Sequence, residues 1–245
     1  MISARGLVKR FGEQTVLDGV DLEVEPGSVH FVLGRSGVGK SVLIKHVVGL
    51  LAPSAGSLTF NGQEVASLDR ASLRQLRMRC QLIFQHPALF EQLTVLENVA
   101  MPLRKRFQWS GRQADVAARS VLATLDVDGF AERRPVELGT GVQKRISVAR
   151  ALALEPEVLL YDEPTTALDP VAARRLDHVI RQASDTRGLT SVVVSHDLES
   201  VAAIADRVTF LEAGRVAFDG SREAWLSCAL PTVQAFKGGG ARWRP

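Results

Sequence analysis

A glycine-rich stretch, GRSGVGKS at residues 34–41, has the composition of a loop that binds phosphate. It lies between an apolar segment, HFVL, and a run with helical character, SVLIKHVVGLL. In a strand, loop and helix of this kind, the glycines let backbone N–H groups curl around phosphate oxygens at the positive end of the helix. Lys40 would then reach the β- and γ-phosphates of a nucleotide, and the Ser41 hydroxyl would bind Mg²⁺. The residues expected at the phosphates are Gly34, Arg35, Ser36, Gly37, Val38, Gly39, Lys40 and Ser41.

A second candidate is a pair of carboxylates at the end of another apolar segment, EVLLYDEPT at residues 157–165. Successive residues of a strand point to opposite faces, so Asp162 and Glu163 cannot share one role. Asp162 would hold Mg²⁺ through its water shell, and Glu163 would orient or deprotonate the water that attacks a phosphate. Taken alone, the pair could equally be an acidic turn, and the phosphate loop favours the catalytic interpretation.

Strand-like and helix-like segments alternate along the chain, which indicates an α/β fold in which helices cover a sheet. Residues 16–34 are expected to form short strands interrupted at Gly19 and at the Pro-Gly pair of EPGS, before a helix from Lys40 to about Leu51. Hairpins are expected in LTFNGQEV and in DRVTFLEAGRVAFDG. Buried strands are expected at QLIFQ, EVLLYDEP and TSVVVSHD, with a helix over 170–185.

The stretch from about 70 to 150 has a different character. Apart from the strand at QLIFQ, it shows helical periodicity with many Arg and Ala, as in ADVAARSVLATLDV. Pro87, Pro102 and Pro135 are expected to break its helices. We interpret the stretch as a mostly helical insertion.

The tail after about Ser221 contains a glycine triplet followed by ARWRP, and we expect it to be partly frayed. Phe236 and Trp243 are unusual in a frayed end. Docking of the tail on a second subunit or another partner is the alternative.

Length and composition limit the class of protein. A chain of 245 residues suits one α/β domain of ordinary size, and it contains no internal repeat. Its two cysteines are too few and too far apart for a disulfide framework or a metal site, so a reducing location is expected. The net charge of +3 comes from interspersed acidic and basic residues, which disfavours a nucleic-acid surface. We find neither a signal-peptide core nor a run of about 18 apolar residues, so membrane association is expected through a partner.

With these residues in place, the sequence resembles, over nearly its whole length, the ATPase subunits of ATP-binding-cassette (ABC) transporters. Phe11 in KRFGEQTVL matches the aromatic residue that stacks on adenine, although a core role is the alternative for Phe11 alone. Gln85 in LIFQHPALF matches the glutamine that joins the metal site to the helical subdomain. Asp169 in TTALD resembles the aspartate that crosses the dimer interface. His196 in VVVSHD resembles the histidine that contacts the γ-phosphate.

The resemblance implies a P-loop NTPase fold of the ABC type, with a mixed sheet core, an N-terminal antiparallel β-subdomain and an inserted helical subdomain. The implied limits are 1–220 for the ATPase domain, about 86–155 for the inserted helical subdomain and 221–245 for a C-terminal extension. The implied cofactors are ATP and Mg²⁺. The implied catalytic residues are Glu163, His196 and Gln85, and the implied metal ligands are Ser41, Gln85 and Asp162.

The family's signature segment is altered in this chain. The usual pattern is Leu-Ser-Gly-Gly, whereas ELGTGVQKRISVARAL places Gly139 at the serine, Thr140 at the first glycine and Gly141 at the second. The serine normally donates a hydrogen bond to the γ-phosphate of the ATP held by the other subunit, and Gly139 has no hydroxyl. The branched Cβ of Thr140 is expected to crowd a position that normally holds glycine. Nucleotide binding is therefore a firmer expectation than fast hydrolysis.

The family's geometry implies that each phosphate loop works with the signature segment of a second subunit. A monomer would then hold two half-sites, ATP would drive dimerisation, and hydrolysis would reopen the dimer. The implied partners are a second ATPase subunit, expected to be a copy of this chain, and transmembrane permease subunits. The expected location is peripheral, at the cytoplasmic face of the inner membrane.

Three stretches, GRSGVGKSVLIKHVVGLLAP, LFEQLTVLENVAMPLR and PTVQAFKGG, resemble the MlaF-like ATPases of phospholipid and mammalian-cell-entry transport. Lipid transport is therefore expected, with a lipid-carrier protein and a small regulatory subunit as further partners. Import of polar amino acids or other small solutes is an alternative, as is an ATP-binding regulatory subunit with weak hydrolysis. A soluble ATPase of DNA repair or translation is disfavoured, since those proteins carry two cassettes or a long coiled-coil insertion.

Overall fold

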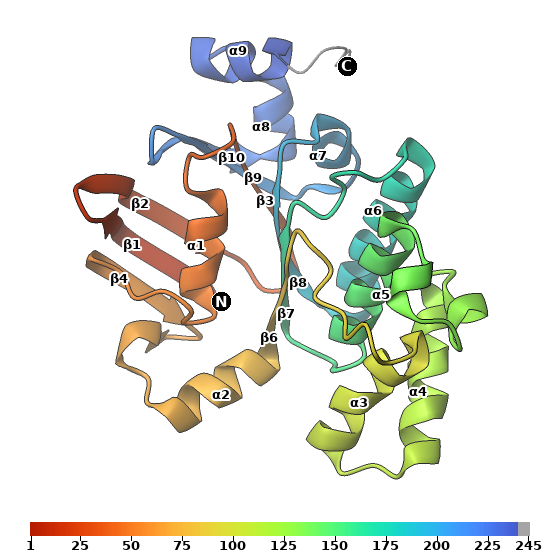
Figure 1. The fold of residues 1–245 in the computed structure, drawn as a ribbon. Coiled ribbons are helices and arrows are strands. Elements are labelled where there is room, and N and C mark those ends of the chain that lie inside the picture. The colour runs from red at the N-terminus through yellow and green to blue at the C-terminus, as the bar shows by residue number, and fades with distance from the viewer. Residues whose placement is uncertain (240–245) are drawn as a thin grey trace.

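A six-stranded sheet and a four-stranded sheet organise the computed structural model, which describes residues 1–239 (Figure 1). The strands are β1 (Ile2–Phe11), β2 (Gln14–Val24), β3 (Val29–Gly34), β4 (Ala55–Phe60), β5 (Gln63–Glu64), β6 (Cys80–Ile83), β7 (Val158–Asp162), β8 (Thr190–Ser195), β9 (Arg207–Glu212) and β10 (Arg215–Ser221). The helices are α1 (Lys40–Val47), α2 (Arg70–Arg79), α3 (Val95–Phe107), α4 (Gly111–Thr124), α5 (Thr140–Leu152), α6 (Pro170–Arg187), α7 (Leu198–Ile204), α8 (Arg222–Ser227) and α9 (Pro231–Gly239). Short 3₁₀ turns occur at Val65–Ser67, Asp128–Phe130 and Pro135–Glu137.

The six-stranded sheet has the order β10-β9-β3-β8-β7-β6. Its strands from β9 to β6 are parallel, and β10 pairs antiparallel with β9, so the sheet is mixed as expected. The phosphate loop follows β3, the acidic pair ends β7, and His196 follows β8. These three strands are neighbours, and parallel strands end at the same edge of a sheet. The topology therefore brings together three segments that are far apart in the sequence.

The four-stranded antiparallel sheet, in the order β2-β1-β4-β5, forms the expected N-terminal β-subdomain. The prediction that Gly19 interrupts a strand is wrong, because β2 runs through it. Leu7 faces Val20 and Val8 faces Asp18, so Gly19 is the extra residue of a bulge, with a φ of 77°. A bulge absorbs one residue without ending the ladder. Both predicted hairpins, β4-β5 and β9-β10, are confirmed.

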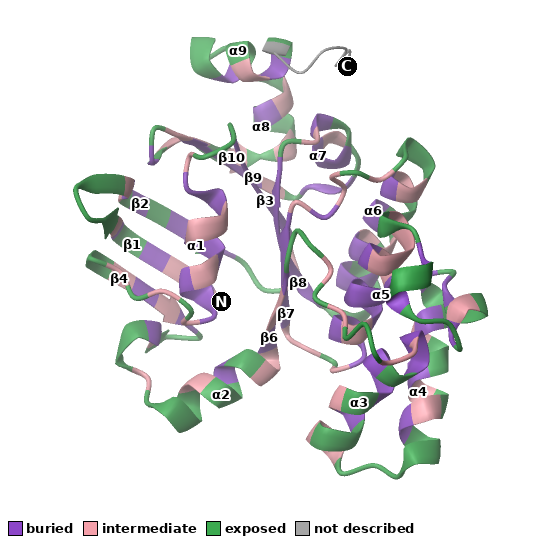
Figure 2. Ribbon diagram, in the orientation of Figure 1, coloured by how far each residue is buried: buried purple, intermediate pink, exposed green. Residues whose placement is uncertain are grey.

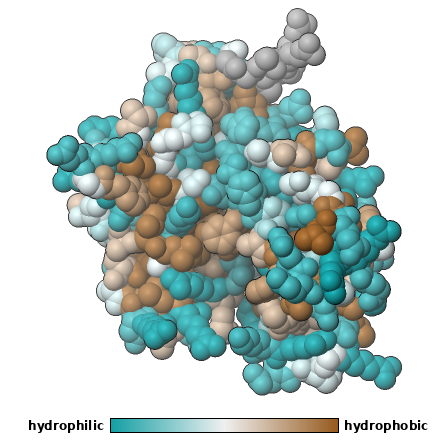
Figure 3. All heavy atoms as spheres, viewed as in Figure 1, coloured by the Kyte–Doolittle hydropathy of each residue, from teal (hydrophilic) through white to brown (hydrophobic). Residues whose placement is uncertain are grey.

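The core lies on both faces of the six-stranded sheet. Along β3, Phe31 and Leu33 belong to a cluster with helices α3 to α7, whereas Val32 belongs to a cluster with α1, α2 and the antiparallel sheet. The alternation follows from the period of two along a strand. Figure 2 shows the sheet as the buried centre of the fold, with α1 on one side and α5 and α6 on the other. On the face seen in Figure 3, hydrophilic residues cover most of the rim and hydrophobic residues gather toward the middle.

Two helix boundaries differ from the sequence prediction. Helix α1 ends at Val47 rather than about Leu51, because Gly49 takes a left-handed φ of 62° and its N–H donates to His46 O at 3.0 Å. Pro102 lies inside α3 and does not break it. Buried residues on both sides of Pro102, including Val99 and Leu103, stabilise the helix against the local cost of proline.

In the sequence, helices α3, α4 and α5 come between β6 and β7, which pair directly in the sheet. The three helices are therefore an insertion between two neighbouring parallel strands (Figure 1). Helix α2 precedes β6 and is separate from this group. Helix α3 begins with a capping box, in which Thr94 accepts from Glu97 N at 3.1 Å and Glu97 accepts from Thr94 N at 2.8 Å. The domain limits 1–220, 86–155 and 221–245 remain predictions.

The expected fraying of the tail is wrong for residues 222–239, which form α8 and α9. Trp225 and Val233 are fully buried, and Phe236 packs with its ring centroid 5.0 Å from that of Phe210 on β9. Aromatic packing of this kind favours order over fraying. Gly240 and the ARWRP segment, including Trp243, lie outside the described residues.

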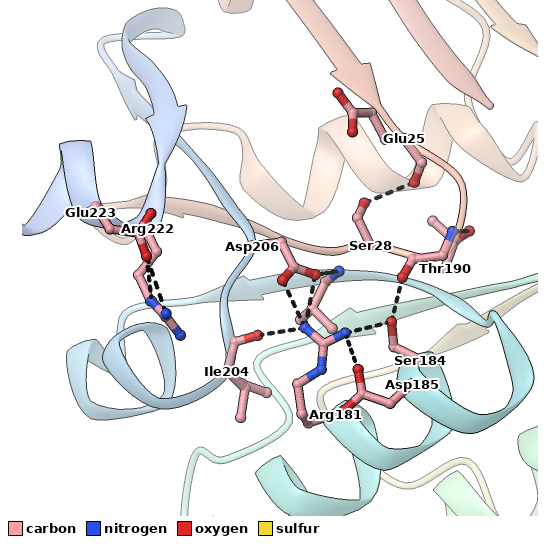
Figure 4. Close-up of polar contacts among 12 residues, drawn as sticks. Glu25, Ser28, Arg181, Ser184, Asp185, Thr190, Ile204, Asp206, Arg222 and Glu223 are labelled. Atoms are coloured by element: carbon pink, nitrogen blue, oxygen red, sulfur yellow. Dashed lines mark hydrogen bonds and ion pairs between the residues drawn. The ribbon is translucent and has the colours of Figure 1, made fainter.

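A polar network ties α6 to the loops at the opposite end of the sheet from the phosphate loop (Figure 4). Arg181 donates to both carboxylate oxygens of Asp206, at 2.9 and 2.8 Å, and to Ser184 Oγ at 3.0 Å. Ser184 Oγ in turn donates to Gly27 O before β3. Hydrogen bonds between charged groups are strong, so this network fixes α6 against β3 and β9. No helix in the described part of the chain combines the length and apolar composition that a bilayer span requires.

Candidate nucleotide-binding site

The loop between β3 and α1 has a backbone that requires glycine at two points. Gly39 has a φ of 102°, and a Cβ there would lie 2.7 Å from Leu17 Cδ2. A Cβ on Gly34 would lie 2.6 Å from the backbone oxygen of Leu211. Larger residues at either position would open the loop. The loop leads directly into the N-terminus of α1, where free N–H groups can bind an anion.

Lys40, the first residue of α1, places its ammonium group across the loop. The side chain is buried, and Nζ donates to Gly34 O at 2.8 Å and to Arg35 O at 3.1 Å. Nζ also lies 3.6 Å from Glu163 Oε1. A cation is therefore held beside the glycine-rich backbone, where a phosphate chain would lie.

Ser41 and Asp162 meet at the base of the loop. Ser41 Oγ donates to Asp162 Oδ1 at 2.6 Å, and the Asp162 side chain is buried at the end of β7. A hydroxyl and a carboxylate are hard oxygen donors, and Mg²⁺ in nucleotide sites usually takes one or two such ligands besides phosphate oxygens and water. The donor set therefore fits Mg²⁺.

Glu163 occupies an unusual backbone position. Its φ is 51°, and its N–H donates to Val194 O at 2.9 Å. The left-handed region costs a non-glycine residue about 1–2 kcal/mol, so the surrounding contacts must hold it there. Lys40 lies near Oε1 of the Glu163 carboxylate. The other oxygen, Oε2, lies 2.7 Å from His196 Nδ1 and accepts a hydrogen bond from Thr166 Oγ1 at 3.2 Å.

Most of these groups line an open cleft of about 500 Å³, whereas Asp162 is buried behind Ser41 and is not part of the lining. Gln85 reaches this cleft although it lies two residues beyond β6 and is exposed. The side chain of His196 is 63% exposed, so it can turn toward a ligand. The cleft-lining residues are Val16, Arg35, Ser36, Gly37, Gly39, Lys40, Ser41, Val42, Gln85, Glu163, Thr166 and His196.

A second hollow, of about 550 Å³, lies between the helical insertion and α6. It contains none of the predicted site residues, and most of its lining surface is apolar, with Leu125, Val171 and Val179 beside charged residues such as Arg145 and Arg174. Chemistry needs convergent polar groups, so we place the site in the slightly smaller cleft.

Phe11 is not among the residues that line the cleft within the described chain. It ends β1 with 47% of its surface exposed, and the Lys9 ammonium lies 5.1 Å from its ring centroid. Sequence reasoning missed three lining residues, Val16, Val42 and Thr166. The two valines carry no chemical signal, whereas Thr166 lies three residues after Glu163, where a hydroxyl can reach back to a carboxylate in a turn.

The signature segment lies apart from the cleft. Gly139 is the N-cap of α5, and no atom of residues 1–239 lies within 4 Å of an ideal Cβ at this position. Thr140 is exposed, and a Cβ on Gly141 would lie 3.2 Å from Leu168 Cδ2. Asp169 caps α6 by accepting from Ala172 N at 2.9 Å. The monomer therefore does not bring the signature residues to its own phosphate loop.

A family profile described as ABC transporter matches residues 17–166. The chain is 41% identical to a sulfate/thiosulfate import ATP-binding protein of Bordetella parapertussis, over 97% of this chain and 67% of that protein. It is 40% identical to a methionine import ATP-binding protein of Caulobacter vibrioides, over 96% of this chain and 72% of that protein. It is 33% identical to the intermembrane phospholipid transport system ATP-binding protein of Haemophilus influenzae, over 97% of this chain and 90% of that protein.

A solved dimeric ATP-binding cassette, in a post-hydrolysis state bound to ADP and Pi, superposes with a TM-score of 0.85 at 29% identity. The match covers 91% of this chain and 99% of that one. The chain therefore belongs to the ABC transporter family, as an ATPase subunit that binds ATP and Mg²⁺ and works as a dimer with transmembrane permease subunits.

Proposed function

We propose that Glu163 orients and deprotonates the water that attacks the γ-phosphate of ATP. The observation that carries this assignment is the position of its carboxylate, held between Lys40 on one oxygen and His196 on the other at the edge of the cleft. A carboxylate at this point can accept a proton from water beside a bound phosphate. His196 is then assigned the contact with the γ-phosphate.

The remaining cleft residues are assigned to binding. Residues 34–41 enclose the phosphates through backbone N–H groups and the Lys40 ammonium. Ser41 and Asp162 would hold Mg²⁺, with Gln85 as a further ligand from the insertion side. The metal supplies charge neutralisation at the phosphate oxygens. Phe11 is assigned to adenine stacking because its exposed ring lies at the end of β1.

The second half of each site is assigned to another copy of this chain. Gly139, Thr140 and Gly141 would meet the γ-phosphate of the partner's ATP at the start of α5, and Asp169 would cross the interface. Figure 1 labels α1 and α5, and the hydrophobic residues toward the middle of the same view in Figure 3 suit a surface that a second subunit covers.

A test of the catalytic assignment is Glu163→Gln. The amide keeps the shape but cannot take a proton, so turnover should fall by about 10²- to 10⁴-fold while ATP affinity stays within about twofold. Size exclusion with ATP should then show an accumulated dimer. Parent-level turnover in the variant would overturn the assignment.

The transported substrate is proposed to be phospholipid or a related lipid. Three stretches of the sequence support this substrate, as does the similarity to the Haemophilus phospholipid-transport protein along 97% of the chain. Sulfate or methionine import is the competing proposal, favoured by the higher identities of 41% and 40%.

We propose that the permease docks on a groove of about 370 Å³ between β6 and the helical insertion. Phe84, Phe90 and Met101 on its wall are 43%, 49% and 37% exposed, and exposed apolar residues of this size suit a protein contact. Docking there would hold the subunit at the cytoplasmic face of the inner membrane. A lipid-carrier protein and a small regulatory subunit complete the proposed assembly.

The proposed substrate can be tested with the complex co-purified from detergent extracts. The purified complex would be reconstituted in proteoliposomes, and ATP-dependent transfer of a fluorescent phospholipid would be compared with uptake of sulfate and of methionine. Lipid transfer alone supports the proposal. Uptake of either solute without lipid transfer would replace it.

A further inference from the structure

Lys144 is a buried cation that the binding and catalytic assignments leave unexplained. It lies on α5, near the signature segment, with 5% of its surface exposed. Its Nζ donates to Glu163 O at 3.2 Å and to Thr166 O. Both acceptors belong to the turn that follows β7. A helix of the insertion is thereby bonded to the backbone of the carboxylate assigned to catalysis.

The two acceptors control the orientation of that carboxylate. Glu163 needs outside contacts because its φ of 51° is unfavourable for a residue with a Cβ. Thr166, whose carbonyl accepts from Lys144, donates its hydroxyl to Glu163 Oε2 at 3.2 Å. Lys144 therefore holds both the backbone of Glu163 and the residue that orients its side chain.

The charge of Lys144 fits this position. Burial lowers the pKa of the Lys144 amine, and the nearby Glu163 carboxylate opposes that effect. A buried ammonium is stabilised when carbonyl oxygens and a carboxylate surround it. An apolar residue of similar length would fill the space but could not hold the two carbonyls.

We infer that Lys144 is a positioning residue that ties the orientation of Glu163 to the signature helix of the same subunit. The inference rests on the catalytic role proposed for Glu163. Since the start of α5 is assigned to the partner's nucleotide, a shift of α5 would reach the subunit's own Glu163 through Lys144. Each site would then respond to occupancy of the other through a direct hydrogen-bonded link.

The test compares Lys144→Met, Lys144→Arg and Arg145→Met in the full chain. Arg145 is the matched control, because it is the next residue on α5 and its Nη1 donates to the carbonyls of Leu125 and Asp126 instead. Lys144→Met should lower kcat about ten- to a hundredfold with KM and ATP affinity within about twofold. Lys144→Arg should recover much of the loss, and Arg145→Met should keep parental kcat.

Thr166→Val provides an independent measurement, because it removes only the hydroxyl on Glu163. It should lower kcat about tenfold at unchanged ATP affinity. The double variant Lys144→Met/Thr166→Val should lose no more than the worse single variant, since both act through Glu163. If Lys144→Met does not fold, the inference is tested by Thr166→Val alone. A Thr166→Val variant with the kcat of the parent then overturns the inference.

Three further results would overturn the link. These are an unchanged kcat in Lys144→Met, a loss of ATP affinity and melting temperature together with kcat, or multiplicative losses in the double variant. Glu163→Gln is measured in the same assay to separate the two proposals. If Glu163→Gln retains parental turnover, the catalytic assignment fails and the inference fails with it. If Glu163→Gln is inactive while Lys144→Met is fully active, only the inference about Lys144 fails.

Discussion

The phosphate cleft and the signature segment differ in how many contacts their residues make with other residues of the same chain. In the cleft, Glu163 contacts both Lys40 and His196 within a hollow built from several strand ends. At the signature, a Cβ added at Gly139 would meet no atom of the described part of the chain within 4 Å, and Thr140 is exposed. Charged side chains of the first region contact one another, and the second region is open to solvent. The difference agrees with the proposal that the signature residues face another subunit.

The largest effect should come from the cleft. Lys40→Ala removes the ammonium beside the phosphate loop, so ATP affinity should fall by at least about a hundredfold. Isothermal titration calorimetry with ATP measures this directly. Lys45→Ala, on the same helix α1 but outside the cleft lining, is the control and should bind ATP as the parent does. Equal ATP affinity in Lys40→Ala and the parent would contradict the assignment of the cleft.

A smaller effect of opposite sign should come from the signature. Gly139→Ser supplies the missing hydroxyl where space is open, and a hydrogen bond formed in the transition state should raise turnover about ten- to a hundredfold. Adding Thr140→Gly should raise it further. Monomer ATP affinity should not change, because the signature lies apart from the subunit's own cleft. If neither variant is faster, alone or with the permease, the altered signature does not limit hydrolysis.

The smallest effect on activity should come from the interior of β3, which lies outside both regions. His30 on β3 is fully buried, and burial lowers its pKa to about 4 from an ordinary value of 6.5. Above pH 6.5 the imidazole is neutral in both states, but as pH falls toward 4 the unfolded chain takes up a proton first. Stability should therefore decrease by about 3 kcal/mol between pH 6.5 and 4 from this group.

Urea unfolding at pH 7.5 and pH 4.5 checks this prediction in the parent and in His30→Gln. The variant should lose less stability than the parent between the two pH values, and its turnover at pH 7.5 should stay close to parental. A pH dependence identical in both proteins would show that His30 does not contribute.

Some features could be predicted from short stretches of the sequence. The phosphate loop, the acidic pair and both hairpins follow from glycines, carboxylates and short apolar runs whose meaning depends on close neighbours in sequence. The landmarks Gln85 and His196 came from the family resemblance, and both line the cleft.

Other features depend on contacts between distant segments and were not predictable. The bulge at Gly19 depends on its pairing with β1, and the continuity of α3 through Pro102 depends on burial against the core. Helix α9 forms because Phe236 packs on Phe210 and Trp225, whereas its own sequence suggests fraying. The contact of Lys144 with Glu163 joins residues on two elements and has no sequence signal of its own.

The most direct test of a site shared between two subunits is complementation in mixed dimers. Lys40→Ala disables the cleft, and Thr140→Glu places a negative charge where the signature would face the partner's phosphates. Each variant alone should hydrolyse ATP at less than about a tenth of the parental rate. In an equimolar mixture about half of the dimers pair the two variants and hold one complete site, so ATPase activity should recover to about a quarter of the parental rate. A mixture no faster than the average of its two components would contradict a site built from the cleft of one subunit and the signature of the other.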